Sequence, residues 1–440
     1  MSACCSNHGP LNYSGRLNNS PLRTHASLIV STNPHVTVEP LCASEWQRRC
    51  CLAIRILAGF EFVLILATWP LWWGGNAFPE IPPISSLALP RIADRLLVAT
   101  LLAACAMILS GIRCRRWSVA ARIVALVAAA SLVLTNQHRL QAWHWLFMMS
   151  LAASAFRPES CLQLLRSILA SVYVCSALSR ISTTVHQGMS AAIVDQLLRI
   201  VGIDARAAGG GTVEILCHVF NAAELIIGLL LIYPKMRRCG ILPAMALHGT
   251  LLIALGPLGL RHHHAVQLWN LCFLCLIPVA FSGPVSVVGS GNVSQPWVYR
   301  TSMLLVWLFP LSGLIGFADN WPSWQLYSSR PETWTLRIRD AKKGYLPESL
   351  KPLVSEPAPL DDWVTVRLDR WSLAETESPI YPEDRFQCEV IRRIVGRFPA
   401  DAEFRVEISE PQPWLWWQRR QRTIQSRSEL DAERRRFVLN

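Results

Sequence analysis

Apolar residues occur along this chain in blocks of about 20, and these blocks constrain the fold more than any other feature of the sequence. A helix needs roughly 20 apolar residues to cross the hydrocarbon core of a bilayer. Hydrophobic residues make up 52% of the 440 residues, and charged residues make up only 16%. The sequence therefore predicts an all-α polytopic membrane helix bundle with about nine transmembrane helices.

Nine segments have the length and composition of a span: 51–73, 93–112, 119–135, 141–156, 161–178, 213–233, 239–259, 265–281 and 301–317. The third and fourth are short and flank the polar stretch 136–139, so we expect a tight hairpin there. Residues 191–201, between the fifth and sixth segments, have the pattern of an amphipathic helix at the membrane interface.

Composition divides the chain into four parts. Residues 1–45 are polar and contain no apolar core of a signal peptide, so we expect a disordered cytosolic leader. Residues 46–318 hold the spans. We expect residues 319–410 to form a small α+β extramembrane domain, and residues 411–440 to form a basic, Trp-rich helical tail (Trp414, Trp416, Trp417, Arg419, Arg420 and Arg422).

The prediction of an α+β domain depends on two kinds of periodicity. Segments 333–339, 363–368 and 403–408 alternate apolar and polar residues, as strands do. In segment 385–398, Phe386, Val390, Ile394 and Phe398 follow one another at intervals of four residues, which places them on one helical face.

Basic residues in short loops predict the orientation of the spans. They precede the first span and lie between spans two and three and between spans six and seven (Arg48, Arg49, Arg113, Arg115, Arg116, Lys235, Arg237 and Arg238). All three groups fall on one side if the spans alternate, and the positive-inside rule makes that side cytoplasmic. We therefore expect a bacterial inner (cytoplasmic) membrane protein with a cytoplasmic N-terminus and its C-terminal domain outside.

The net charge of +12 has a simple explanation in topology and anionic lipid. The sequence shows no basic groove motif and no zinc pattern of a nucleic-acid-binding protein. Membrane lipids are therefore the expected partners, and nucleic acid is not.

Ionisable residues inside the sixth and seventh spans form the main candidate site. A charge at the bilayer centre costs roughly 2.5–3.5 kcal/mol, so it needs a partner. His218 and Asn221 lie near Glu224 on one helical stripe, and His248 lies at a similar depth if the two spans are antiparallel neighbours. We expect Glu224 to pair with His248, with His218 on the same interior face.

This pair has two interpretations. Glu224, His248 and His218 are candidate acid–base residues that relay a proton or hold a ligand. Alternatively, they form a buried polar clamp that fixes helix packing. Glu61, in the middle of the first span, is a further candidate member of the group.

A second polar group is expected at the outer face. Arg139 and Arg261 there offer an anionic site for a headgroup, a quinone carbonyl or a carboxylate, unless they only snorkel at span ends. The run of three histidines after Arg261 has no carboxylate or cysteine companion, so no metal site is predicted.

The chain has 14 cysteines, and its single C-x-x-C motif, Cys272 and Cys275, lies inside the eighth span. A helix places both sulfurs on one face, which makes a membrane-embedded redox dithiol chemically possible. We favour a structural role, because a thiolate is difficult to form in an apolar helix and Cys packs well as a small apolar residue.

Three motifs resemble the DoxX and MauE families. The segment YVCSALSRI (173–181) resembles their Y-x-x-S-G-L-x-K-L element. The segment AELIIGLLLIYPKMRR (223–238) resembles their E-L helix with a basic turn. ALHGTLLIALGPLGL (246–260) with LWN (268–270) is similar to a pattern of MauE/DoxX-like redox-associated membrane proteins.

The chain is also similar to the HTTM family, which is related to vitamin-K-dependent carboxylases. The shared features are the opening AIRI (53–56), the Y…G-L-x-K-L element, and an E-L helix followed by a span with His. The Gly and Lys of that element are Ala177 and Arg180 here. Arginine cannot readily act as a base, so carboxylase chemistry is not expected, and Arg180 joins the candidate ligand-binding arginines.

Three classes of function remain. The resemblance to DoxX and MauE implies support for the redox poise or maturation of exported proteins, with an exported partner and without catalysis of its own, and we favour this class. The second is an HTTM-like membrane enzyme that uses Glu224 and His248. The third is a proton or small-molecule transporter, which we disfavour because no inverted repeat is visible. The sequence identifies no cofactor.

Overall fold

The computed structural model of the protein describes residues 38–112, 114–181, 188–204, 210–283, 297–357, 359, 361–410 and 420–437. Residues 42–440 form one compact unit. Most of the predicted leader lies outside the described residues. The first helix begins at Val38, so the last residues of the segment expected to be disordered are helical.

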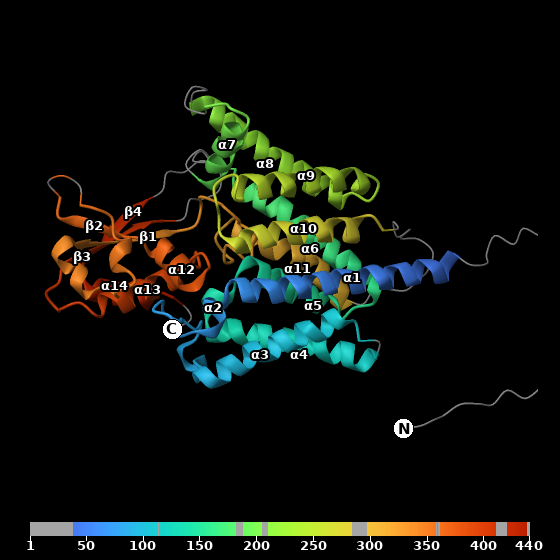
Figure 1. The fold of residues 1–440 in the computed structure, drawn as a ribbon, viewed down its shortest axis with the longest axis horizontal. Helices are drawn as coiled ribbons and strands as arrows, with labels where there is room; N and C mark the ends of the chain where they lie inside the picture. The colour runs from blue at the N-terminus through green and yellow to red at the C-terminus, as the bar shows by residue number, and fades with distance from the viewer. Residues whose placement is uncertain are drawn as a thin grey trace, which may run out of the picture. The chain divides into compact units, whose positions relative to one another are not determined.

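Helices occupy residues 38–313 of the described chain (Figure 1). They are α1 (Val38–Ala67), α2 (Trp69–Trp73), α3 (Arg91–Ser110), α4 (Arg115–Thr135), α5 (Ala142–Ala153), α6 (Pro158–Ser179), α7 (Met189–Ile200), α8 (Gly210–Ile232), α9 (Arg237–Leu255), α10 (His264–Phe281) and α11 (Trp297–Gly313). A helix is present at each of the nine predicted spans, and α7 confirms the short helix expected between the fifth and sixth.

Seven of the described helices are long and apolar enough to cross a membrane: α1, α3, α4, α6, α8, α9 and α10. The chain is therefore a multi-pass membrane protein by the length and composition of its helices. At 1.5 Å per residue, α5 and α11 measure only about 18 and 26 Å, which is less than the roughly 30 Å of a hydrocarbon core. The count of nine spans stays a prediction.

The first predicted span is interrupted near its end. Pro70 lies in the first turn of α2 and cannot continue α1, because proline has no amide hydrogen to donate. The Thr68 hydroxyl donates to the Leu64 carbonyl (2.7 Å) and accepts from the Trp72 indole (2.9 Å), which holds the junction. The chain then leaves the helix at Gly74, whose φ of +67° suits glycine.

Helix α6 is the central helix of the bundle, and α8 packs directly against it. Gly228 makes this close approach possible. A Cβ at position 228 would lie 2.8 Å from Val174 Cγ2 and 3.0 Å from Tyr173 Cβ. Small residues at such crossings let membrane helices approach closely, which brings polar side chains of α8 within reach of α6.

The C-terminal region forms the predicted small α+β domain. Its antiparallel sheet has the order β2-β1-β3-β4 and consists of β1 (Thr333–Arg339), β2 (Trp363–Val366), β3 (Phe404–Ser409) and β4 (Gln421–Ile424). The register places Leu336 opposite both Val366 and Val406. The same region contains three helices: α12 (Leu368–Thr376), α13 (Asp384–Val395) and α14 (Arg427–Arg434).

The helical face predicted for α13 is confirmed, since Phe386, Val390, Ile394 and Phe398 are all buried in the domain core. In the described part of segment 411–440, which was expected to be helical, residues 427–434 form α14, whereas residues 421–424 form strand β4. Strand β4 pairs with β3, and Ile424 and Leu430 belong to the same core, so the domain extends beyond residue 410. Trp414, Trp416, Trp417 and Arg419 lie outside the described residues.

The α+β domain contacts the bundle through the loop that joins α2 to α3. Phe78 and Ile81 of this loop are buried in the domain core. Arg385 of α13 donates to the Pro82 carbonyl (2.7 Å) and to Gln137 Oε1 (2.9 Å). The end of the bundle that carries the α2–α3 loop therefore shares its packing with the α+β domain.

Candidate functional site

Glu224 of α8 forms a buried ion pair with Arg180, which follows the last residue of α6. Arg180 also donates to the Ser176 carbonyl (3.2 Å) and to Ser176 Oγ (3.1 Å), and Asn221 Nδ2 reaches the Arg180 carbonyl at 3.4 Å. The predicted pairing of Glu224 with His248 is wrong. The short loop after α8 predicted only α9 as its neighbour, whereas α6 also packs against α8 and supplies the cation.

His248 of α9 is satisfied by neutral partners. Its Nε2 lies 2.7 Å from the Tyr173 hydroxyl, and its Nδ1 lies 2.9 Å from Asn270 Oδ1. Asn270 uses its Nδ2 to donate to the Val266 carbonyl (2.8 Å), so its oxygen is the acceptor toward His248. His248 therefore carries its hydrogen on Nδ1 and accepts from Tyr173 at Nε2, which describes a neutral imidazole with both nitrogens in use.

His218 does not belong to this interior. It is exposed on α8, whereas Asn221 and Glu224 are buried. Six residues separate His218 from Glu224, which amounts to about 120° around a helix of 3.6 residues per turn. The expected stripe is therefore buried at Asn221 and Glu224 but not at His218.

A second buried pair joins Glu61 of α1 to His144 of α5. His144 Nδ1 lies 2.5 Å from Glu61 Oε1, and His144 Nε2 lies 3.2 Å from the Ala129 carbonyl of α4. The carbonyl can only accept, so Nε2 carries the hydrogen that reaches it. The contact of Nδ1 with Glu61 links α1 to α5 and gives both buried side chains a polar partner. The histidine in the fourth predicted span was the available signal for this partner of Glu61, and it was missed.

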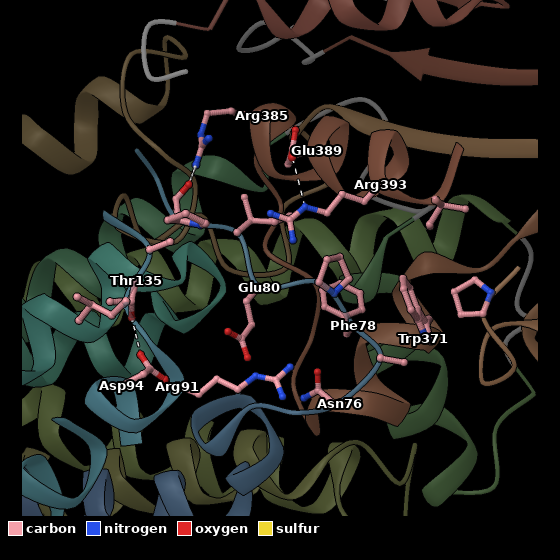
Figure 2. A pocket seen from close by; sticks show the side chains of 18 of the residues that line it. Asn76, Phe78, Glu80, Arg91, Asp94, Thr135, Trp371, Arg385, Glu389 and Arg393 are labelled. Atoms are coloured by element: carbon pink, nitrogen blue, oxygen red, sulfur yellow. Dashed lines mark hydrogen bonds and ion pairs between the residues drawn. The ribbon is translucent and has the colours of Figure 1, made fainter. Parts of the chain in front are cut away.

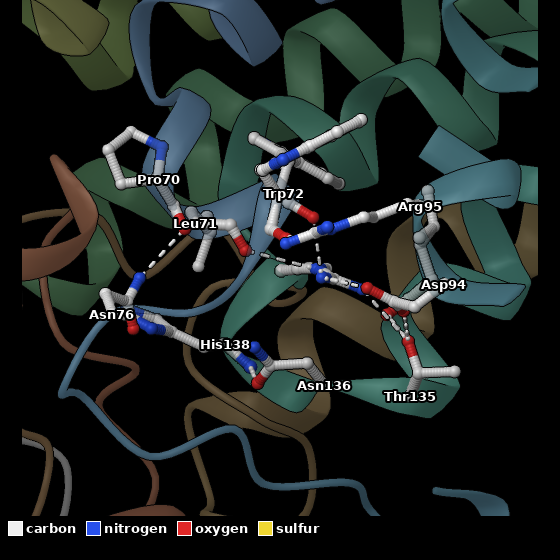
Figure 3. Close-up of polar contacts among 12 residues, drawn as sticks. Pro70, Leu71, Trp72, Asn76, Asp94, Arg95, Thr135, Asn136 and His138 are labelled. Carbon is white, nitrogen blue, oxygen red and sulfur yellow. Dashed lines mark hydrogen bonds and ion pairs between the residues drawn. The ribbon is translucent and has the colours of Figure 1, made fainter. Parts of the chain in front are cut away.

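Arg139 follows α4 in the short 3₁₀ helix η2 (Gln137–Arg139), where it is completely buried. Figure 3 labels the residues that accept its hydrogen bonds, namely Leu71, Trp72, Asp94 and Thr135. Two of its nitrogens donate to the two oxygens of Asp94, both at 2.6 Å. The remaining hydrogens reach Thr135 Oγ1 (3.0 Å) and the carbonyls of Leu71 (3.3 Å) and Trp72 (2.8 Å). All five donors of the guanidinium are therefore used, and Arg139 holds α2, α3 and α4 together instead of offering a ligand site.

Arg261 and the adjacent histidines lie at the loop between α9 and α10. Arg261 is exposed, with a φ of +50°. His263 caps α10 by accepting from the Ala265 amide (3.2 Å), and its Nε2 lies 2.6 Å from Glu377 of the α+β domain. Within the described residues, no group of three or more His, Cys, Asp or Glu side chains is placed to hold a metal ion.

The cysteines of the C-x-x-C motif lie in different environments, since Cys272 is buried and Cys275 is exposed. A different pair of thiols is in contact. Cys50 Sγ of α1 lies 3.0 Å from Cys161 Sγ of α6, and both residues are buried. The two cysteines are 111 positions apart in the sequence, so no local pattern could have predicted their contact.

A polar pocket of about 490 Å³ lies between the bundle and the α+β domain (Figure 2). Its walls come from the loop after α2, the first turns of α3, and helices α12, α13 and α14. Five of its lining residues are arginines and three are carboxylates. A separate pocket of about 690 Å³ lies next to the C-terminal end of α11, and Glu332, Glu383 and Asp384 are among the residues that line it.

Burial shifts the pKa of several groups in the α+β domain and at its contact with the bundle. It raises the pKa of Glu383 to about 8 and that of Glu332 to about 7, because a buried carboxylate loses its hydration. Burial lowers the pKa of His138 to about 4, and its Nε2 lies 2.9 Å from the Pro379 carbonyl. Glu383 and His138 are therefore mainly uncharged at neutral pH.

Comparison with models of protein families, with curated proteins and with solved structures finds no match to this chain. The resemblances to DoxX, MauE and HTTM proteins therefore stay predictions that depend on the motifs quoted above.

Proposed function

We propose that this protein supports the redox poise or maturation of exported proteins as a membrane scaffold, without catalysis inside its bundle. In this proposal the bundle holds the α+β domain at the outer face of the membrane, where an exported partner meets it. The observation that supports this choice is that each of three buried carboxylates of the bundle contacts a basic side chain. Glu224 is used by Arg180, Glu61 by His144, and Asp94 by Arg139.

A membrane enzyme of HTTM type would place an acid and a base around a space that a substrate can enter. Glu224 and His248 instead have separate partners, and the pockets described above are lined by other residues. A proton pathway would likewise need polar groups linked in series, whereas these pairs lie in separate parts of the bundle. The geometry favours the polar-clamp interpretation of the sequence over the acid–base one.

The test compares exported proteins in bacteria that carry or lack this gene. Free thiols of exported proteins are alkylated in intact cells and quantified by mass spectrometry, together with the abundance of each protein. We expect the deletion to change the thiol state or the abundance of a defined set, and the wild-type gene to restore it. An unchanged exported proteome would contradict the proposal.

Two variants separate scaffolding from catalysis. Glu224→Gln keeps a hydrogen-bonding group beside Arg180 but removes the carboxylate, and His218→Gln on the exposed face of α8 is the matched control. If the bundle is a scaffold, each variant restores the exported proteome in proportion to the folded protein in the membrane. Loss of function in normally folded Glu224→Gln alone would instead favour the enzyme or the proton pathway.

A further inference from the structure

The polar pocket between the bundle and the α+β domain carries a surplus of positive charge. Its arginines come from the start of α3 and from the segment that holds α13, the turn after it and α14 (Arg91, Arg385, Arg393, Arg397 and Arg434). Its three carboxylates are Glu80, Asp94 and Glu389. Asp94 is already neutralised by Arg139, which does not line the pocket. Only two carboxylates therefore remain to balance five guanidinium groups.

The arginines also differ in whether their guanidinium groups have a partner in the protein. Arg393 and Arg434 share Glu389, at 3.3 and 3.6 Å. The guanidinium groups of Arg91 and Arg397 make no hydrogen bond or ion pair within the part of the chain that the structure describes. Arg91 comes from the bundle and Arg397 from the domain. The pocket thus presents open two-pronged donors whose geometry matches phosphate or carboxylate oxygens.

The bundle wall of the pocket continues into a surface that suits acyl chains. Arg91 is the first residue of α3, one of the helices able to cross the membrane. The next residues on its outer face are Ile92 and Leu96, which are 75% and 63% exposed. Large apolar side chains this exposed at the start of a spanning helix are expected to face lipid.

Aromatic residues indicate that this level of the bundle is the membrane interface. Trp69 and Trp73 stack with ring centroids 4.7 Å apart, and the Arg95 guanidinium lies 4.9 Å from the Trp73 centroid. Tryptophan gathers at the headgroup level of membranes because its ring is apolar and its N–H is polar. Trp73 itself lines the pocket, so the pocket opens at the depth where headgroups lie.

We propose that this pocket binds the headgroup of an anionic phospholipid. Its phosphate lies between Arg91 of α3 and Arg397, two residues after the end of α13, and its acyl chains follow Ile92 and Leu96 along α3. Glu80 projects into the same space (Figure 2) and limits the net positive charge, which favours a singly charged headgroup such as phosphatidylglycerol. A lipid bound there would bridge the bundle and the α+β domain. The proposal depends on the membrane-spanning helices and not on the redox function proposed above.

The test measures lipid binding to the purified full-length protein in a neutral detergent by native mass spectrometry. We expect phosphatidylglycerol to bind at least about tenfold more tightly than phosphatidylcholine of the same chain length, because the surplus guanidinium charge of the pocket repels the choline cation. Arg91→Gln with Arg397→Gln should remove this preference. The matched control is Arg370→Gln with Arg405→Gln, which removes two charges from α12 and β3 outside the pocket and should keep the preference.

Two further measurements test whether the double arginine variant is folded and whether the acyl chains contribute to binding. Thermal unfolding of the Arg91→Gln/Arg397→Gln variant should match the wild type, because neither side chain has a partner to lose within the described residues. Ile92→Ser should weaken binding of long-chain phosphatidylglycerol more than binding of a short-chain form. Equal binding of both lipids, or an unchanged preference in the double arginine variant, would overturn the proposal. Displacement of the lipid by equimolar glycerol phosphate would overturn the lipid assignment and identify a soluble phosphate as the ligand.

Discussion

Glu224 of α8 is held by Arg180 at the end of α6, and not by His248 of α9. This ion pair crosslinks two helices that pack closely at Gly228, four residues further along α8. His248 instead joins α9 to α6 and α10 through Tyr173 and Asn270. The two candidate residues therefore act in separate contacts, each of which ties α6 to a neighbouring helix.

The first prediction concerns the Arg180–Glu224 pair. Replacing either residue with Ala strands a buried charge, which typically costs about 3–5 kcal/mol. We expect Glu224→Ala and Arg180→Ala each to reduce the unfolding free energy of the detergent-solubilised protein by an amount of this order. The double variant should cost clearly less than the sum of the two. Additive costs would show that the two side chains do not interact, and the exposed His218→Ala is the control.

The second prediction concerns Cys50 and Cys161, whose sulfurs lie 3.0 Å apart. Mild oxidation with copper phenanthroline and oxygen should remove the two thiol hydrogens and join α1 to α6 by a disulfide. Peptide mass spectrometry would detect the Cys50–Cys161 crosslink, and Cys50→Ser would abolish it. Replacing Cys272 and Cys275 with Ala should leave the crosslink and the expression level unchanged. Failure of oxidation to form the crosslink in folded protein would contradict the contact.

The third prediction concerns orientation. Cys114 precedes α4 and Cys239 lies in the first turn of α9, and both are exposed at the end of the bundle away from the α+β domain. An added cysteine at exposed Glu356 marks the domain itself. With the domain outside, a membrane-impermeant maleimide added to spheroplasts should label Glu356→Cys and leave Cys114 and Cys239 unlabelled until the membrane is permeabilised. The reverse pattern would mean that the domain is cytoplasmic.

Periodicity predicted the helices and most of the sheet because these patterns are local. Segment 333–339 became β1 without change, and the apolar face of α13 was correct. Strand β4 was missed because Gln421–Ile424 buries only its last residue and therefore shows no alternation. Segments of this kind take their structure from the neighbouring strand, which the sequence does not show.

The polar site was harder to predict, because periodicity reports the face of a helix and not its neighbour. Glu224 was correctly expected inside the bundle, yet its partner came from α6 and not from α9. Asp94 was not recognised as the partner of Arg139, 45 residues away. Charge balance was the usable signal, since each buried carboxylate requires a cation or a shared proton.

The last prediction concerns pH and begins with Glu383, the residue before α13. Its Oε1 accepts from the Asn320 amide (2.6 Å) and from Asn320 Nδ2 (2.9 Å). Asp319, Asp384 and Tyr381 are the titratable groups around it, and Tyr381 donates to Asp319 at 2.6 Å. Burial raises the pKa of Glu383 from 4.5 to about 8, so the folded protein keeps a proton that the unfolded chain releases.

The stabilisation from this proton is complete below pH 4.5 and is lost as the pH rises to about 8. His138 acts in the opposite direction, because its lowered pKa costs stability only as the pH falls from 6.5 to about 4. Between pH 6.5 and 8 the carboxylates therefore dominate. We expect the unfolding free energy of the full chain to fall across this window by up to about 1.4 kcal/mol per pH unit for each proton released.

Glu383→Gln keeps the oxygen that accepts from Asn320 but cannot titrate, so it should flatten the slope and exceed the wild type in stability at pH 8. A wild-type stability that rises across the window, or an equal slope in Glu383→Gln, would show that Glu383 is charged in the folded protein.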